Sequence, residues 1–277
     1  MLGKVYDYQK ALAVPYFFDV DFASWSNSFR DDMDGEGRKL FKTLETKVKY
    51  ENETVVGFVQ YGRTAFGFDE HGEISDAVSY PVIRQLYFDK EKKEVGAELL
   101  EAALEDLNES GKVYAFFHYF GMSCFARHGK LFEKLPWVEA VLKEQGFVVE
   151  HENVYYSFAF DSQETYDAQE NEIKLVWHDE SKGNHQVCDF MLEAQQIGGC
   201  EVHYVSETVA YLRWIYLNDD VQNKGLGSRC MNRLKFELKE KGCTRFDTDT
   251  ALNNDRAQHY YEKNGFVREG ITRSYER

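Results

Sequence analysis

A glycine-containing loop lies between two segments of different periodicity, and no other stretch constrains the local fold as strongly. The run 211–217 (YLRWIYL) is apolar, aromatic and β-branched, which is typical of a buried strand. An apolar residue then recurs every four positions, as on one face of a helix: Leu226, Cys230, Leu234 and Leu238. The segment 222–228 (QNKGLGS) is therefore predicted to be a strand-to-helix turn.

Such a turn directs several backbone N–H groups and the positive end of a helix dipole to one point, which suits a phosphate. Two glycine patterns of phosphate loops fit poorly. A Walker-type loop needs a lysine after its last glycine, whereas Ser228 and Arg229 follow Gly227. A dinucleotide fingerprint needs a third small residue where Cys230 stands, and no distinct acidic partner for a ribose follows it.

The remaining pattern, Gln222-x-x-Gly225-x-Gly227, resembles the pyrophosphate loop of the GNAT acetyltransferase superfamily. Downstream, the segment 254–266 (NDRAQHYYEKNGF) resembles that family's closing Asn-x-x-Ala, Tyr, Gly-Phe helix. Two spaced motifs in the expected order support the resemblance more strongly than either alone. The resemblance covers residues 200–277 closely. It implies an α/β fold with a mixed α+β sheet, acyl-CoA N-acyltransferase activity, and acetyl-CoA (coenzyme A) as co-substrate without a metal.

The chain has 277 residues, of which 43% are hydrophobic, so two packed domains are expected. Its net charge of −15 disfavours nucleic acids and anionic membranes as partners, since phosphate contacts depend on lysine and arginine. An acidic surface attracts cationic small molecules, or it simply keeps the protein soluble.

The five cysteines form no CxxC pair, which predicts a reduced, cytoplasmic chain. The apolar run 11–18 is too short to span a bilayer and lacks a small-residue cleavage site, so neither secretion nor membrane anchoring is expected. The histidines and cysteines of the C-terminal half lack zinc-like pairing, so no metal site is expected among His178, His185, Cys188, Cys200 and His203.

Apolar periodicity and turn residues predict the remaining elements. From residue 43 they give the order β, β, β, helix, β, helix, β, ending in a strand at 154–160. The polar segment 161–171 is expected to be a linker. It separates a domain at 1–160 from a domain at 172–277. In the second domain we expect a helix at 187–197 and, as the last element, a strand at 271–275.

The two halves carry traces of one repeat. Shifted by 129 residues, the segment 84–88 (RQLYF) lies over 213–217 (RWIYL), and Gly96 lies over Gly225. A repeat of this length indicates a duplication that gave two tandem GNAT-like domains.

A second match, between the Gly-Phe pairs 146–147 and 265–266, has a shift of 119. The smaller shift places an insertion in the first copy near 120–130. The second copy is short in another region, because only about 40 residues separate Glu172 from Tyr211. One strand or helix on the acceptor side is therefore expected to be missing.

The copies differ where chemistry would take place. Glu98 stands where the second copy has Gly227, and Lys93 stands where it has Gln222. A carboxylate repels phosphate, and its side chain prevents close approach to the backbone. We expect a degenerate N-terminal copy and an intact C-terminal copy that binds the coenzyme.

The resemblance implies which residues of the C-terminal copy bind coenzyme A. The loop would hold the pyrophosphate, 215–217 would pair with the pantetheine amides, and Asn254 would contact the cofactor arm besides capping its helix. The implied cofactor-binding residues are Ile215, Tyr216, Leu217, Gln222, Asn223, Lys224, Gly225, Leu226, Gly227, Ser228 and Asn254.

The family's general acid maps onto Tyr261. A phenol with a pKa near 10 can protonate a departing thiolate whose thiol has a pKa of about 8.5. The adjacent Tyr260 faces another side of the helix and is expected to have a core role.

No base for the acceptor amine stands out. The segment 208–217, where many relatives place a carboxylate, contains none. By the two-residue period of a strand, Asp247 and Asp249 point to one face. Together with Glu201, His203 and Glu207 of the preceding hairpin, they stay open as candidates.

Two hypotheses from different classes remain. The first is an acetyl-CoA-dependent N-acetyltransferase that transfers an acetyl group directly to a primary amine of a small molecule or peptide. The alternative is a non-catalytic acyl-CoA-binding sensor or regulatory protein, which the short acceptor half and the missing strand carboxylate favour. The acceptor stays unidentified, and a monomer or homodimer is expected.

Overall fold

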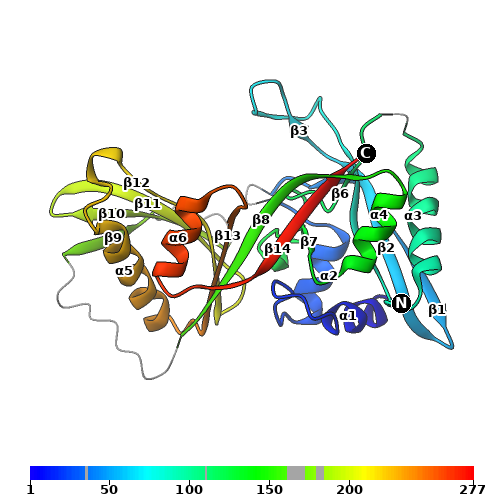
Figure 1. Cartoon of the computed structure of the whole chain (residues 1–277), viewed down its shortest axis with the longest axis horizontal. Coiled ribbons are helices and arrows are strands. Elements are labelled where there is room, and N and C mark those ends of the chain that lie inside the picture. Colours follow the sequence, from blue (N-terminus) through cyan, green and yellow to red (C-terminus); the bar gives the residue numbers. More distant parts are fainter. Residues whose placement is uncertain (35–36, 110, 161–171, 179–183) are drawn as a thin grey trace. The chain divides into compact units, whose positions relative to one another are not determined.

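In a computed structural model, the structure describes residues 1–34, 37–109, 111–160, 172–178 and 184–277. The chain forms two compact units, and each contains a sheet with helices packed on it (Figure 1). Unit 1 comprises Met1–Glu152 and Ile271–Arg277, and unit 2 comprises Asn153–Gly270. The expected α/β class with a mixed sheet is confirmed.

The sheet of unit 1 has the strand order β1-β2-β5-β6-β14. Its strands are β1 (Phe41–Glu51), β2 (Thr54–Thr64), β5 (Pro81–Phe88), β6 (Tyr114–Ala115) and the Ile271–Glu276 part of β14 (Val267–Glu276). Shorter strands are β3 (Gly67–Phe68), β4 (Ile74–Ser75) and β7 (Leu131–Phe132). The helices are α1 (Leu2–Lys10), α2 (Phe22–Arg30), α3 (Lys93–Leu107), α4 (Pro136–Glu144) and the 3₁₀ turn η1 (Ser123–Phe125).

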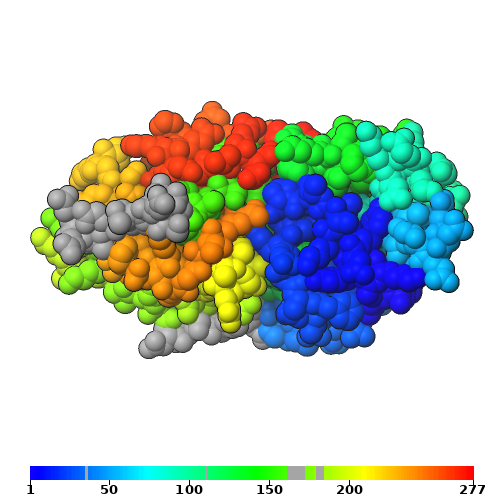
Figure 2. Space-filling model, turned by 90° about the horizontal axis from the view of Figure 1, so that it is seen from below, coloured from blue at the N-terminus to red at the C-terminus, as the bar shows by residue number. Residues whose placement is uncertain are grey.

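Helices cover both faces of β2 in unit 1. Phe58 packs against Tyr8 of α1 and Phe29 of α2, whereas Gly57, which points to the other face, lies beside Leu99 of α3. This explains why β2 is buried almost along its whole length. Figure 2 shows α1 and α2 in dark blue at the surface of unit 1.

The sheet of unit 2 has the strand order β8-β13-β12-β11-β10-β9. Its strands are β8 (Val148–Ala159, from Asn153), β9 (Ile173–Trp177), β10 (His185–Leu192), β11 (Gln195–Tyr204), β12 (Val209–Leu217) and β13 (Arg245–Ala251). Between them lie the 3₁₀ turn η2 (Asp219–Val221) and the helices α5 (Leu226–Glu240) and α6 (Asp255–Lys263).

The helices α5 and α6 lie on one face of the unit 2 sheet (Figure 1). The four apolar residues that predicted α5 are all buried in this core. Among the described residues no helix lies between β9 and β12, so unit 2 is short where the sequence indicated a missing element.

The helix expected at 187–197 is wrong. The segment belongs to the antiparallel hairpin of β10 and β11, which turns at Glu193 with a positive φ of 54°. Cys188 and Phe190 alternate with less buried neighbours and fill the core side of β10. The burial of every second side chain therefore outweighs the helical preference of the residues around the turn.

The boundaries of the two units differ from the expected ranges 1–160 and 172–277, and the difference lies in strands β8 and β14. The residues from Asn153 to Ala159 pair antiparallel with β13, so this part of β8 belongs to unit 2. Tyr275 and Glu276 of β14 pair with β6, so the C-terminal strand belongs to unit 1. Backbone pairing, which acts over long separations, thus places both boundaries inside strands. The linker expected at 161–171 lies outside the described residues.

Candidate active site

The strands β12 and β13 pair over only part of their length. They run parallel from the pair Val209 and Arg245 to the pair Leu212 and Thr248. Both strands are described along their full length, and beyond the last pair they no longer hydrogen-bond to each other. A bulge at Arg213, where β12 has one residue more than β11, adds local twist at this point. The two strand backbones therefore separate beyond this pair, and we call this gap between the backbones the opening.

The predicted glycine loop leads from the end of β12 to α5. Gly225 precedes the helix with a φ of +78°, a left-handed conformation that favours glycine. A Cβ added at Gly227 would lie 3.2 Å from a ring carbon of Tyr260. The first turn of α5 thus exposes backbone N–H groups at the positive end of its dipole, as an anion site requires.

Gln222 holds this loop in place. Its amide nitrogen donates to the Leu217 carbonyl at 2.7 Å and to the Asp219 carboxylate at 3.0 Å. Its amide oxygen accepts from the Arg256 guanidinium at 2.5 Å. The side chain of Gln222 therefore connects the end of β12, the loop and α6.

A cleft of about 450 Å³ lies in unit 2 between the end of β12, the glycine loop and α6. All predicted site residues line it except Lys224 and Leu226. Lys224 donates to the Asp220 carbonyl at 2.8 Å, and the Leu226 side chain is buried in the core. The cleft is also lined by residues that we did not predict as site residues: Arg256, Ala257, His259, Tyr260 and Lys263.

Three of these additional residues form a basic face on α6. Arg256, His259 and Lys263 lie three and four positions apart, so they share one side of the helix, and all three are exposed. The spacing is visible in the sequence, but we did not predict a basic face because the chain as a whole is acidic.

Tyr261 is buried, with 5% of its surface exposed, and lines the cleft. Burial raises the pKa of its phenol above 10.0, the Thr248 side chain opposes this increase by hydrogen bonding, and the Asp249 carboxylate adds to it. The phenol is therefore protonated at neutral pH and can donate a proton.

Tyr260 packs against the core of unit 2, as expected, and also lines the cleft. Its hydroxyl donates to the Gly227 carbonyl at 2.9 Å, which ties α6 to the first turn of α5. Asn254 caps α6 as predicted, since its side chain accepts from the Ala257 N–H at 3.1 Å.

Asp247 and Asp249 lie on one face of β13, as the two-residue period predicts. Asp247 is fully buried in a two-bond ion pair with Arg245 and accepts a further hydrogen bond from Tyr155. Burial raises the pKa of Asp247, and Arg245 partly offsets the increase. Asp249 accepts hydrogen bonds from Tyr211, at 2.5 Å, and from Asn153.

The other candidate bases lie on β11 and its hairpin. Glu201 is hydrogen-bonded to His185 and to the Trp214 indole at 2.6 Å each, and the contact with His185 lowers the pKa of Glu201. The ring of His203 stacks on that of His185, with 4.1 Å between the centroids. Glu207 is exposed at the hairpin tip.

The matching region of unit 1 is closed by apolar side chains. The ring of Phe88 lies directly against Gly96, in the space where a Cβ would be. The Trp137 indole of α4 donates to the Phe88 carbonyl at 3.1 Å. At the shift of 119 residues, Leu142 takes the place of Tyr261, so this copy has no phenol there.

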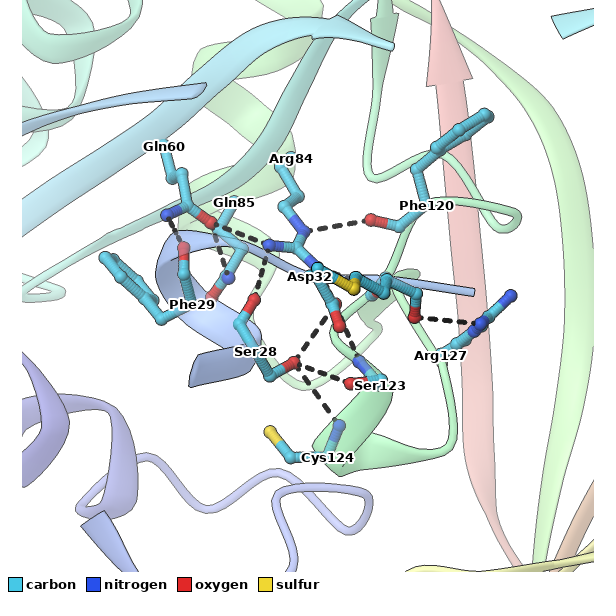
Figure 3. Close-up of polar contacts among 12 residues, drawn as sticks. Ser28, Phe29, Asp32, Gln60, Arg84, Gln85, Phe120, Ser123, Cys124 and Arg127 are labelled. Atoms are coloured by element: carbon cyan, nitrogen blue, oxygen red, sulfur yellow. Dashed lines mark hydrogen bonds and ion pairs between the residues drawn. The ribbon is translucent and has the colours of Figure 1, made fainter. Parts of the chain in front are cut away.

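A buried ion pair occupies the place in unit 1 where β5 and β6 end their pairing. Arg84, which follows the last pair of Ile83 with Ala115, contacts the Asp32 carboxylate and donates to the carbonyls of Phe120 and Ser28 (Figure 3). Arg84 and Asp32 are both nearly inaccessible to solvent. The opening that exists in unit 2 is thus filled in unit 1 by a polar cluster.

Among the described residues, no helix is long and apolar enough to cross a membrane. Within the same residues, no group of three or more histidine, cysteine or acidic side chains is arranged to hold a metal ion.

The acetyltransferase (GNAT) family model matches residues 147–266. This range starts in β8 and includes the glycine loop, the cleft and Tyr261. A sequence comparison with curated proteins finds no significant match.

Several solved structures are similar in fold to this chain over its whole length. One is a tandem GNAT protein from the clavulanic acid biosynthesis pathway, with 12% identity and a TM-score of 0.66 over 100% of this chain and 94% of the other. A GCN5-related glucosamine N-acetyltransferase region of a fungal β-N-acetylglucosaminidase has 12% identity and a TM-score of 0.64, over 100% of this chain and 37% of that multi-domain protein. A GNAT-family acetyltransferase from Colwellia psychrerythraea has 13% identity and a TM-score of 0.52, over 100% and 96% of the two chains. Residues 147–266 therefore match the acetyltransferase (GNAT) family, and the chain as a whole has the fold of tandem GNAT proteins.

Proposed function

We propose that the chain is an acetyl-CoA-dependent N-acetyltransferase that transfers the acetyl group directly to a primary amine. The observation that carries the proposal is the cleft of unit 2, in which the first turn of α5 and the buried phenol of Tyr261 border the same space. An anion site and a proton donor in one cleft match the two ends of a thioester of coenzyme A.

The loop and α6 supply groups for the phosphates of the coenzyme. The N–H groups after Gly225 would accept the pyrophosphate at the end of the helix dipole. The basic face of α6, with Arg256 and Lys263, borders the same cleft and would bind the 3′-phosphate. These positive groups stand out in a chain with a net charge of −15.

The end of β12 supplies a backbone edge for the pantetheine arm. Ile215 and Leu217 pair with β11 on one side, whereas on the other side they lie beyond the last pair of β12 with β13. Unpaired strand groups next to a cleft can hydrogen-bond to the amides of an extended ligand. Such pairing would direct the thioester toward Tyr261.

The proposed chemistry is attack of a neutral amine on the thioester carbonyl. A C–N bond forms, the C–S bond breaks, the thiolate takes the proton of Tyr261, and the proton that the nitrogen loses on forming the amide restores the phenol. No cysteine is among the residues that line the cleft, and all five are described. This supports direct transfer over an acyl-cysteine intermediate.

The test is release of free thiol from acetyl-CoA in the presence of propylamine, benzylamine, glucosamine, spermidine and a peptide with an unblocked N-terminus. Glucosamine is included because one structural neighbour is a glucosamine N-acetyltransferase region. We expect amine-dependent thiol release, with an N-acetyl product found by mass spectrometry. Coenzyme binding without turnover on any amine would instead support the acyl-CoA sensor.

A further inference from the structure

The opening between β12 and β13 has two faces, and carboxylates lie on one of them. Successive side chains of a strand point to opposite sides, so Phe246 and Thr248 face α5 and α6, while Asp247 and Asp249 face away. Asp249 is the first residue of β13 after the last pair with β12. Its carboxylate therefore lies at the rim of the opening, across the sheet from Tyr261.

Two neighbouring strands hold the Asp249 carboxylate. The Tyr211 hydroxyl on β12 donates to one oxygen at 2.5 Å, and the Asn153 amide on β8 donates to the other. These donors fix the side chain at the point where β12 leaves β13. Its negative charge also raises the pKa of Tyr261, so the two groups lie within electrostatic range of each other.

The other carboxylates of this face are less suited to receive a proton from a substrate. Asp247 precedes the opening and is fully buried in its ion pair with Arg245. Glu201 lies on β11, which is one strand farther from β13 than β12 is, so it does not border the opening.

We propose that Asp249 is the catalytic base of unit 2, which accepts the proton of the acceptor ammonium, and that Tyr211 and Asn153 position it. This assignment rests on the proposed acetyltransferase function. It places the base and the acid on opposite faces of one opening, so that the amine arrives from one side and the thiol leaves on the other.

The ammonium gives one proton to Asp249, which passes it to water, and the neutral amine attacks the thioester carbon. As the intermediate collapses, the C–S bond breaks and Tyr261 protonates the thiolate. The second nitrogen proton returns to the tyrosinate. The products are the amide, coenzyme A thiol and one released proton.

The test compares Asp249→Asn with Glu240→Gln on the amine panel named above. Asp249→Asn keeps the size of the side chain and an oxygen that can accept the Tyr211 hydrogen bond, but it removes the carboxylate that would take the proton. We expect kcat/KM to fall about 10²-fold, the usual scale for a lost general base. Glu240→Gln removes an exposed carboxylate from the C-terminal end of α5, away from the glycine loop, and should leave activity within about threefold. The dissociation constant of coenzyme A, from calorimetry, should change in neither variant.

Two further measurements distinguish a base at Asp249 from a purely structural role of this residue. Added formate should restore part of the activity of Asp249→Asn. Hydroxylamine, which is largely neutral at pH 7, should lose less activity than propylamine, which is an ammonium ion. If Asp249→Asn fails to fold, Tyr211→Phe removes only the O–H bonded to Asp249, and the same contrast between the two acceptors applies to it.

The outcomes distinguish the assignment from the proposed function. A parent protein that acetylates no amine would overturn both. An active parent with an Asp249→Asn variant within about threefold of it would overturn the base assignment alone. Equal losses for hydroxylamine and propylamine, without rescue by formate, would also overturn it and leave the acetyltransferase intact.

Discussion

At the scale of single residues, two adjacent tyrosines of α6 border the cleft in different ways. Tyr261 is buried among Tyr156 and Phe266, with its phenol beside Thr248. Tyr260 instead bonds to the Gly227 carbonyl. The proposed acid and a residue that contacts the glycine loop thus come from one turn of helix, which provides a matched pair of variants.

Tyr261→Phe should lower kcat by about 10²-fold or more while coenzyme affinity and folding change little, because it removes only the O–H. Steady-state kinetics with calorimetry checks this. Tyr260→Phe is the control, and it should keep kcat within a few-fold while weakening coenzyme binding. If Tyr261 is only a core residue, Tyr261→Phe keeps its turnover, and Tyr261→Ala costs stability of about 3 kcal/mol or more.

The sequence predicted most of the cleft because its motifs are local. A glycine with positive φ before a helix, and an Asn cap followed by Tyr261, are encoded within a few residues. The function of Tyr260 was not predictable in this way, since its bond to Gly227 depends on how α6 packs on α5.

At the scale of elements, α6 combines a capped N-terminus with a basic face on the cleft. Arg256 additionally bonds to Gln222, so it acts on the loop as well as on the ligand that we propose. Lys263, one turn beyond His259, is the simpler probe of charge.

Lys263→Gln should weaken binding of coenzyme A about five- to tenfold and leave binding of dephospho-coenzyme A nearly unchanged, because exposed charge contacts contribute about 1 kcal/mol. Titration calorimetry of both ligands measures this. The control for net charge is Lys239→Gln, which lies in the last turn of α5, away from the glycine loop. Equal weakening for the two ligands would remove Lys263 from the 3′-phosphate site.

The wrong helix at 187–197 shows why element type can fail. The segment 187–197 (VCDFMLEAQQI) contains helix-forming residues at its end, yet Cys188 and Phe190 fill the core with a two-residue period. Only the presence of β9 and β11 on either side makes the strand the better conformation. Such neighbours are not visible within a short window of sequence.

At the scale of the whole chain, the repeat was readable but the assignment of the last strands was not. The alternating patterns of β8 and β14 predict strands, whereas their partners β13 and β6 are set by pairing between distant segments. The two copies have also diverged in their interiors, since unit 1 contains the buried pair of Arg84 and Asp32 where unit 2 has an opening.

Asp32→Ala should destabilise unit 1 by about 3–5 kcal/mol, because it leaves the Arg84 guanidinium buried without its carboxylate. Urea unfolding followed by tryptophan fluorescence measures the change. Asp31→Ala removes an exposed carboxylate that pairs with Lys39 and should cost at most about 1 kcal/mol. A similar small effect for both variants would mean that the cluster around Arg84 does not hold unit 1 together.

Only unit 2 is expected to bind the coenzyme, and titration calorimetry with coenzyme A measures the number of sites per chain. We predict one site per chain. Gly227→Glu, which copies the residue of the first repeat, should abolish binding while circular dichroism stays unchanged. Glu98→Gly should not create a second site, since Phe88 still lies against Gly96. Two equivalent sites per chain would show that unit 1 also binds the coenzyme, and full binding by Gly227→Glu would show that the glycine loop of unit 2 is not the site.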